Sequence, residues 1–286
     1  MQQRRIGNLT VGAIGLGAMP LSSKDDRPSR EEAVGVVHAA LDAGVTLVDT
    51  ADAYAWDEGE FGHNEELVAE ALRSYGPGAA DVLVATKGGH TRRGAEWELD
   101  GTPSYLRRAC EASLRRLGVE AIGLYQFHRP DPATPWEESI GALRELADDG
   151  LVRMVGISNA DIAQIDAARS ILGDALVSVQ NQFSPGWRSS AGELAHCAEL
   201  GLAWLPWSPF GGVPAAGSLG SAAPAFAEVA DELGASVHQV ALAWHLAQSD
   251  VVVPIPGASR RESILDSAAA ADLELTPEQL ARLDAA

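Results

Sequence analysis

The sequence predicts an α/β fold in which one domain, residues 1–286, forms a single closed (β/α)8 barrel, a TIM barrel. Short apolar runs alternate with amphipathic segments along the chain, which implies parallel strands joined by right-handed helical crossovers. The length of 286 residues is typical of one such barrel. No break in composition marks a linker or a second domain.

Eight apolar runs are the expected strands, at 13–17, 46–49, 82–87, 122–128, 152–158, 177–181, 203–207 and 251–255. The alternative is an open doubly wound sheet, which would carry a G-x-G-x-x-G turn after its first strand. Here the segment GLGAMP has Pro20 in place of the third glycine, and no helix follows directly. The closed barrel is therefore favoured.

Helical periodicity fills the intervals between these strands. It predicts helices at 30–43, 64–75, 103–117, 136–149, 161–172, 191–199, 225–233 with 237–248, and 261–271. Thr102 before Pro103 is a typical helix start, with the threonine as N-cap. Gly150 after ALRELADDG is a typical helix stop, because glycine adopts the left-handed conformation readily.

The composition excludes several classes of function. A formal net charge of −19 argues against a nucleic-acid partner. No apolar run is long enough to span a membrane, and the first residues lack the apolar core of a signal peptide. Cys110 and Cys197 form no spacing pattern, so we expect no disulfide framework, no metal site and a cytoplasmic location. The composition leaves a monomer and a homo-oligomer equally open.

Ionisable side chains end three successive expected strands: Asp49, Lys87 and His128. Tyr54 follows the second strand by five residues. A single polar residue at a strand end is usually a turn or cap residue. In a (β/α)8 barrel, however, the carboxyl ends of the strands meet at one mouth, where active sites lie. We therefore expect these four side chains to lie close together.

The four side chains suit proton transfer to a carbonyl oxygen. A free tyrosine titrates near ~10, and a neighbouring ammonium lowers that pKa by stabilising the phenolate. Asp49 would hold Lys87 in place, and the His128 imidazole would orient a carbonyl oxygen at the Tyr54 hydroxyl. None of the four supplies a hydride, so reduction of a carbonyl requires a cofactor.

Seven motifs in order then identify a family resemblance: VDTADAY, VLVATKGG, LYQFHRPD, VGISN, VQNQFS, LPWSPFGG and VPIPGASRRESI. With these motifs the sequence resembles the aldo-keto reductases over nearly its whole length. The resemblance implies an NADPH-dependent oxidoreductase that reduces an aldehyde or ketone. It makes Asp49, Tyr54, Lys87 and His128 the catalytic tetrad, with Tyr54 as the general acid.

The resemblance also implies a cofactor site. Ser158, Asn159 and Gln180 would bind the nicotinamide carboxamide, and the indole of Trp207 would stack on the nicotinamide ring. The backbone of the SPFGG segment would contact the pyrophosphate, and the start of the last long helix would bind the adenosine phosphate. The remaining implied residues are Ser208, Pro209, Phe210, Gly211, Gly257, Ser259, Arg260, Arg261 and Ser263.

Two departures from the family pattern bear on specificity. Ser263, Asp266 and Ser267 stand where many members have an arginine and a Glu-Asn pair, so the phosphate grip would rest on Ser259, Arg260 and Arg261. NADPH is favoured, and NADH stays open. No long C-terminal loop follows LTPEQLARLDAA, so we expect an open substrate pocket. We expect it to be lined by Trp56, by Trp97 in a loop formed by the segment HTRRGAEWEL, and by Arg129 and Trp187.

Two alternatives of other classes remain at this point. One is a cofactor-sensing regulatory subunit, because channel-associated β-subunits share the barrel and the tetrad. The other is a TIM-barrel isomerase or lyase that binds a phosphorylated substrate at the same loops. The favoured partner is a small-molecule carbonyl compound whose identity the sequence does not specify.

Overall fold

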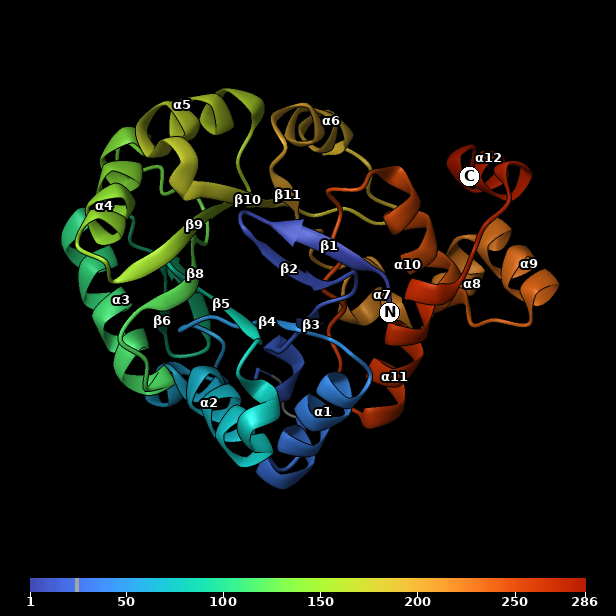
Figure 1. The fold of residues 1–286 in the computed structure, drawn as a ribbon, viewed down its shortest axis with the longest axis horizontal. Coiled ribbons are helices and arrows are strands. Elements are labelled where there is room, and N and C mark those ends of the chain that lie inside the picture. The colour runs from blue at the N-terminus through green and yellow to red at the C-terminus, as the bar shows by residue number, and fades with distance from the viewer. Residues whose placement is uncertain (24–25) are drawn as a thin grey trace.

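Seven parallel strands curl around a central axis in the computed structural model, which describes residues 1–23 and 26–286 (Figure 1). Their order in the sheet is β11-β10-β9-β8-β5-β4-β3, so each strand lies beside the next barrel strand along the chain. The bounds are β3 (Leu16–Gly17), β4 (Leu47–Asp49), β5 (Leu83–Gly88), β8 (Ile122–Phe127), β9 (Val152–Ser158), β10 (Leu176–Gln180) and β11 (Ala203–Trp204).

The eighth expected strand, 251–255, is not a regular strand, although it closes the barrel. It bridges β11 between Val252 and Trp204, and Gly257 just beyond it bridges Gly17 of β3. Pro254 and Pro256 interrupt the segment, and proline has no N–H to donate to a ladder. Their carbonyls still accept from Gly15 and Gly17, at 2.9 Å each. The expected closed barrel is therefore confirmed, with an irregular eighth position.

Helices surround the barrel on its outside (Figure 1). The expected boundaries agree with the observed ones to within about two residues, and Thr102 caps its helix as expected. No helix in the described residues is both long and apolar enough to cross a bilayer.

The helices are α1 (Arg30–Asp42), α2 (His63–Tyr75), α3 (Pro103–Leu117), α4 (Trp136–Asp148), α5 (Ile162–Leu172), α6 (Ala191–Leu200), α7 (Val213–Ala216), α8 (Leu219–Ala222), α9 (Pro224–Leu233), α10 (Val237–Gln248), α11 (Arg261–Ala269) and α12 (Pro277–Asp284). The short 3-10 turns are η1 (Met19–Leu21), η2 (Glu58–Glu60), η3 (Gly76–Ala79), η4 (Gly173–Ala175) and η5 (Ala270–Asp272).

Two antiparallel hairpins were not expected. The first, β1 (Gln3–Ile6) with β2 (Leu9–Gly12), lies across one end of the barrel (Figure 1). Gly7 in its two-residue turn has φ 57°, a conformation that favours glycine. Ile6 and Val11 are fully buried in the same apolar cluster as the barrel interior. This hairpin therefore closes the end of the barrel at which the strands begin.

The second hairpin, β6 (His90–Arg93) with β7 (Glu96–Leu99), follows β5 at the opposite end, where the strands finish. It occupies most of the segment HTRRGAEWEL, for which the sequence predicts a loop. Four residue pairs form its ladder, from His90 with Leu99 to Arg93 with Glu96. The loop expected beside the barrel mouth is thus a regular, hydrogen-bonded element.

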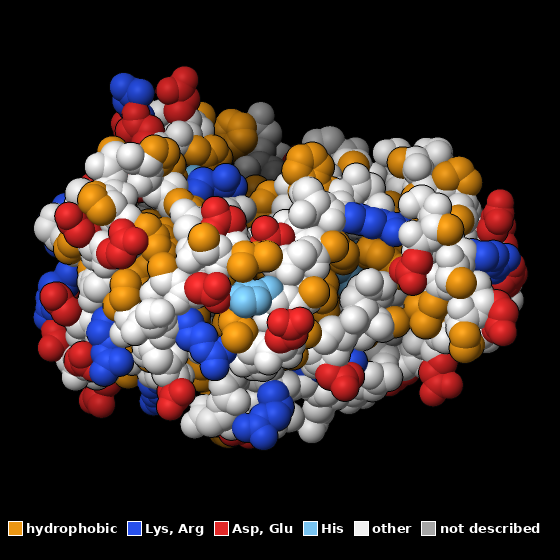
Figure 2. Space-filling model, turned by 90° about the horizontal axis from the view of Figure 1, so that it is seen from above, with side chains coloured by type: hydrophobic (Ala, Val, Ile, Leu, Met, Phe, Trp, Pro, Cys, Tyr) orange, Lys and Arg blue, Asp and Glu red, His pale blue; other side chains and the backbone are white. Residues whose placement is uncertain are grey.

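The surface carries charges of both signs. On the face shown in Figure 2, basic and acidic side chains are interspersed, with apolar side chains between them. Opposite charges also pair across elements, as in Arg107 with Asp149 at 2.7 Å and Arg282 with Glu232 at 2.7 Å. Exposed pairs of this kind contribute little to stability, because water and salt screen them. The stability of the fold therefore rests on its apolar interior.

Leu124 provides a test of that interior. It is fully buried inside the barrel, whereas Leu265 on α11 is 46% exposed. Leu124→Ala should lower the free energy of unfolding by about 2–5 kcal/mol, because it leaves a cavity among packed neighbours. Leu265→Ala should change it by about 0.5 kcal/mol or less. Urea unfolding followed by circular dichroism measures both, and equal effects would contradict the assigned core.

Candidate active site

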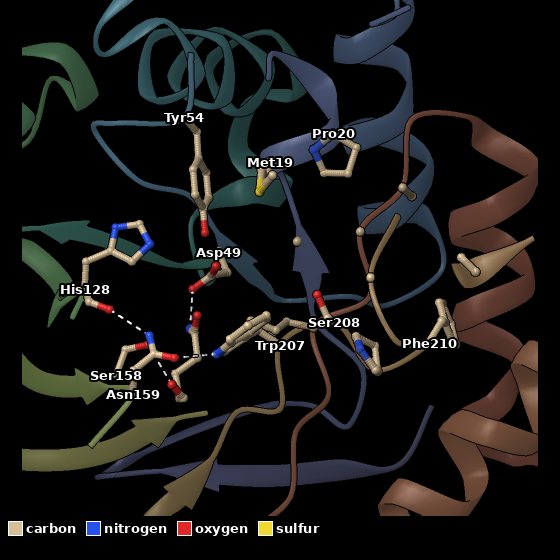
Figure 3. A pocket seen from close by; sticks show the side chains of 18 of the residues that line it. Met19, Pro20, Asp49, Tyr54, His128, Ser158, Asn159, Trp207, Ser208 and Phe210 are labelled. Atoms are coloured by element: carbon tan, nitrogen blue, oxygen red, sulfur yellow. Dashed lines mark hydrogen bonds between the residues drawn. The ribbon is translucent and has the colours of Figure 1, made fainter. Parts of the chain in front are cut away.

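The four expected catalytic side chains meet at the mouth of the barrel. Asp49 ends β4, Lys87 lies near the end of β5, and His128 follows β8 directly. Tyr54 lies on the loop after β4 and points into the same space (Figure 3). This space is part of a cavity of ≈ 700 Å³ that Asp49, Tyr54 and His128 line.

Lys87 lies at the centre of the site and is fully buried. Its ammonium donates to Asp49 Oδ1 at 2.5 Å, to the Thr50 carbonyl at 2.9 Å and to Tyr54 Oη at 3.1 Å. These three acceptors match the three donors of an ammonium. The lysine therefore connects the carboxylate directly to the phenol.

The second oxygen of Asp49 is also fully engaged. Gln180 donates to Oδ2 at 2.8 Å, and Gln126 donates to it at 3.1 Å. Gln126 is a residue that the sequence reasoning missed. It precedes Phe127 on β8 and pairs in register with Lys87, which brings its amide beneath the tetrad. The two amides stabilise the carboxylate on the side away from Lys87.

Two opposing effects act on the pKa of Lys87. Burial lowers it, but the Asp49 carboxylate and the Tyr54 phenol together raise it, and the net direction is upward. Lys87 is therefore a cation at neutral pH. A permanent positive charge 3.1 Å from the phenol oxygen favours any negative charge that develops there.

The pKa of Tyr54 is raised overall. Burial raises it most, whereas the charge of Lys87 lowers it, in the direction expected from the sequence. Burial outweighs the lysine, so the net direction is opposite to the expected one. At neutral pH the phenol consequently keeps its proton, as a proton donor must.

His128 is a neutral imidazole in this site. Burial lowers its pKa well below the ordinary value, and the positive charge of Lys87 adds to this effect. Its ring lies edge-on to Tyr54, with centroids 5.7 Å apart. Nδ1 is buried without a hydrogen-bond partner in the described residues. We assign the proton to Nε2, which leaves that nitrogen able to donate to a carbonyl oxygen.

His90 on β6 is a second imidazole at the mouth, and the sequence reasoning missed it. Its ring meets that of His128 edge-on, at a centroid separation of 4.3 Å. Nδ1 lies 3.1 Å from the Glu98 carbonyl and must donate, because a carbonyl only accepts. Burial lowers the pKa of His90 to about 4, so the ring is neutral at pH 7 and Nε2 is an acceptor.

A hydrogen-bonded group of side chains links the tetrad to the rest of the cavity (Figure 3). Asn159 donates to the His128 carbonyl and to Ser158 Oγ, at 3.0 Å each. Its oxygen accepts from Trp207 Nε1 at 3.2 Å, which fixes the indole against the cavity. Gln180 Nε2 donates to Asp49, so the side-chain oxygen of Gln180 is the atom of this amide that remains to bind a ligand.

Two residues of this cavity have unusual backbone conformations. Asn159 has φ 58° and Ser208 has φ 50°, and no other non-glycine residue of the described chain has a positive φ. Such conformations are costly and concentrate at functional sites. The sequence does not reveal them directly, although asparagine tolerates this region better than most residues.

The far part of the cavity lies between the loop after β11 and the start of α11. Most of the phosphate-binding residues implied by the sequence line it, whereas Gly211, Arg260 and Arg261 lie outside the lining. No side chain caps the first turn of α11. Arg260 and Arg261 are exposed at that turn, and neither has an ion-pair partner in the described residues. The lining set is Ser208, Pro209, Phe210, Gly257, Ser259 and Ser263.

The expected substrate residues divide into two pairs. Trp97 and Arg129 line the cavity near His128, whereas Trp56 and Trp187 are exposed outside its lining. Residues that the sequence reasoning did not name also line it, among them Met19 and Ile255. The expected substrate residues that line the cavity thus come from the β6–β7 hairpin and from the segment after β8.

Asp52, two residues before Tyr54, is buried and has no hydrogen-bond partner for either carboxylate oxygen in the described residues. Burial raises its pKa well above the ordinary value, and the nearby Glu65 raises it further. Glu65 itself accepts from Thr86 and Arg116, at 2.6 Å each. Burial therefore favours the protonated, neutral form of Asp52 in the folded protein.

None of the described residues form a group of His, Cys, Asp and Glu side chains that could hold a metal ion. The chemistry of the mouth rests instead on a phenol, an ammonium, a carboxylate and two imidazoles. A barrel that carries these side chains at its mouth, beside a partly apolar cavity, is typical of the oxidoreductases that act on carbonyl groups.

Comparison with known proteins identifies the family within that class. The profile of the Aldo/keto reductase family matches residues 13–286, and the chain belongs to this family. An uncharacterized oxidoreductase of Schizosaccharomyces pombe is 33% identical over 284 residues, which cover 98% of this chain and 88% of the yeast protein. The resemblance read from the sequence and the expected oxidoreductase class are thereby confirmed.

Two solved structures are similar over the whole barrel. A thermostable aldo-keto reductase in complex with the inhibitor epalrestat superposes with a TM-score of 0.84, at 28% identity, covering 100% of this chain and 99% of that one. An aldo/keto reductase of Klebsiella pneumoniae in complex with NADP and acetate gives a TM-score of 0.82, at 27% identity, covering 99% and 94%.

The buried Asp52 predicts a pH-dependent effect on stability. Its raised pKa means that the folded chain binds more protons than the unfolded chain, so ionisation of this group lowers stability as the pH rises. Asp52→Asn removes that ionisation. The melting temperature of the variant minus that of the wild type should therefore increase from about pH 5 to about pH 8. Asp81→Asn, at an exposed aspartate, controls for the loss of one charge, and a difference that shrinks with pH would contradict the assignment.

Proposed function

We propose that this protein reduces an aldehyde or ketone to the alcohol, with hydride from NADPH and the proton from Tyr54. One observation carries the proposal: the buried Lys87 bridges Asp49 and the Tyr54 hydroxyl at the barrel mouth. This arrangement places a protonated phenol beside a fixed positive charge, which is what protonation of a developing alkoxide requires.

Each side chain has a distinct role in the proposed reaction. His128 donates from Nε2 to the carbonyl oxygen and orients it at Tyr54 Oη. Tyr54 releases its proton to that oxygen, and Lys87 stabilises the phenolate that remains. Asp49 keeps Lys87 charged and in place, and the amides of Gln126 and Gln180 hold Asp49. In the reverse direction, the Tyr54 phenolate would accept the alcohol proton.

The residues along the cavity fit a nicotinamide dinucleotide. NADPH supplies the hydride, the one chemical component that this side-chain set lacks. The indole of Trp207, fixed by Asn159, offers a flat face for the nicotinamide ring. Ser158 and the Gln180 oxygen would bind its carboxamide. The similar Klebsiella pneumoniae reductase was crystallised with NADP, which supports this choice.

NADPH is favoured over NADH by the start of α11. Its uncapped first turn presents backbone amides, and two adjacent arginines stand there without ion pairs in the described chain. The positive end of the helix dipole repels cations at a helix N-terminus, unless a bound anion lies between the cations and the helix. In a chain with a net charge of −19, a 2′-phosphate bound by Ser259, Arg260 and Arg261 accounts for this arrangement.

The proposal extends to the substrate and the location. The substrate is a small carbonyl compound held between Trp97, His90 and Arg129 at the hairpin end of the cavity. A cytoplasmic location is supported by Cys110 and Cys197, which are both buried and unpaired, as in proteins of reducing compartments.

Tyr54→Phe tests the acid assignment. The variant keeps the ring and loses the proton donor, so kcat for reduction of 4-nitrobenzaldehyde by NADPH should fall by at least ~10²–10⁴-fold. The dissociation constant of NADPH, measured by quenching of tryptophan emission, should stay within about twofold, since Tyr54 is not part of the proposed cofactor site. Unchanged kcat would show that another group donates the proton. A chain that binds NADPH but reduces no carbonyl in a broad panel would favour the regulatory alternative.

The double change Arg260→Ala with Arg261→Ala tests the phosphate site. Hydrogen bonds to a charged group contribute about 1.5–3 kcal/mol, so kcat/KM for NADPH should fall about tenfold or more. For NADH, which lacks the 2′-phosphate, it should hardly change. Arg73→Ala, at an exposed arginine of α2 outside the cavity lining, is the matched control. Equal losses with both cofactors would contradict the phosphate assignment.

A further inference from the structure

Arg92 on β6 holds the backbone on both sides of Tyr54. Its Nε donates to the Ala53 carbonyl at 3.2 Å, and its Nη2 donates to the Ala55 carbonyl at 2.6 Å. The carbonyl between them, that of Tyr54 itself, accepts from Ser22 Oγ at 2.8 Å. Three consecutive carbonyls of the tyrosine loop are therefore fixed by side chains from other parts of the chain.

These bonds matter because the tyrosine loop has little regular structure of its own. Tyr54 lies between β4 and η2, outside any helix or strand. Its backbone N–H makes one bond, to the Ala51 carbonyl at 3.3 Å. The position of the phenol relative to Lys87 consequently depends on what holds this loop from outside.

Arg92 also connects Tyr54 to the substrate end of the cavity. Its guanidinium lies over the indole of Trp97, 3.5 Å from the ring centroid, and its Nη1 donates to the Ala95 carbonyl at 2.8 Å. Trp97 in turn lies edge-on to Tyr54, with centroids 6.4 Å apart. One guanidinium thus fixes both the proton donor's loop and an aromatic wall of the pocket.

The hairpin itself is well anchored. At its tip, the Gly94 carbonyl accepts from the Glu58 backbone, and the Gly94 N–H donates to the Glu58 carboxylate, at 3.0 Å each. At its base, Tyr105 of α3 donates to the His90 carbonyl at 2.9 Å. Arg92 therefore transmits the position of a rigid element to the loop.

We propose that Arg92 is a positioning residue, which sets the place of the Tyr54 hydroxyl by clamping the carbonyls of Ala53 and Ala55 to the β6–β7 hairpin. This inference rests on the proposed role of Tyr54 as proton donor. A guanidinium suits the task because its planar fork donates in several fixed directions at once. A lysine at this position keeps the charge and loses the fork.

Arg93 provides a matched control on the same strand. It is exposed, and its guanidinium pairs with Glu98 at 2.6 Å on the solvent side of the hairpin. Arg93→Ala removes the same kind of side chain from the same element and leaves the tyrosine loop untouched. If Arg92→Ala acted only through the lost charge or through a less stable hairpin, Arg93→Ala would show the same loss of activity.

The test compares Arg92→Ala, Arg92→Lys and Arg93→Ala with the wild type, each saturated with NADPH and assayed with 4-nitrobenzaldehyde. Arg92→Ala should lower kcat by ~10–100-fold, because a displacement of about 1 Å at a catalytic group costs rate on this scale. Arg92→Lys should lie between Arg92→Ala and the wild type, and Arg93→Ala within about twofold of the wild type. The NADPH dissociation constant should be unchanged in all three.

Two further readouts separate positioning from general loss of structure. Guanidinium ion at millimolar concentration should partly restore kcat in Arg92→Ala, and sodium ion at equal ionic strength should not. In the alcohol-oxidising direction, the rising limb of the pH profile of Arg92→Ala should shift relative to that of the wild type, because displacing the phenol changes both its burial and its contact with Lys87, and Arg93→Ala should leave this limb in place.

The proposal is overturned if Arg92→Ala has the same kcat as Arg93→Ala while Tyr54→Phe is inactive in the same assay. An active Tyr54→Phe would instead overturn the proposed function, so the two failures are distinguishable. Circular dichroism establishes that each variant is folded. If Arg92→Ala does not fold, Arg92→Lys decides: a reduced kcat at a wild-type melting temperature supports the clamp, and a wild-type kcat contradicts it.

Discussion

The buried ion pair between Lys87 and Asp49 is the constraint on which the rest of the structure depends. Both side chains are almost inaccessible to water, and removing two charges from water costs several kcal/mol per ion. The cost is offset only if every remaining donor and acceptor is satisfied. The barrel meets this condition by surrounding the pair with Thr50, Tyr54 and the two glutamine amides. The Tyr54 phenol, the proposed proton donor, is thus also part of what makes the buried charge tolerable.

The sequence predicts seven of the barrel strands, the long helices between them and the members of the expected tetrad because their signals are local, whereas it does not predict α7, α8 and α12. An apolar run, a helical period or a polar strand end lies within a few residues, and the barrel topology then brings the ends together. The irregular eighth position has an equally local cause, because Pro254 lies within the apolar run and Pro256 follows it directly.

The supporting contacts could not be predicted in the same way. Gln126 reaches Asp49 across 77 positions in the sequence, and Arg92 reaches Ala53 across 39. Such bonds depend on register and side-chain direction, which a single sequence does not contain. The N-terminal hairpin did carry a local signal, since Gly7 and Asn8 form a dipeptide typical of two-residue hairpin turns. The balance of effects on the pKa of Tyr54 required the burial that only the folded chain shows.

The amide of Asn159 has a consequence for ligand binding as a whole. It is bonded on one side to the backbone that carries His128 and on the other to the indole of Trp207. The indole and the backbone that carries His128 are therefore both bonded to one amide. Where two ligands are coupled through a shared contact of this kind, linkage requires that each ligand change the affinity of the other by the same factor. Asn159 makes both bonds from a left-handed backbone conformation, with φ 58°.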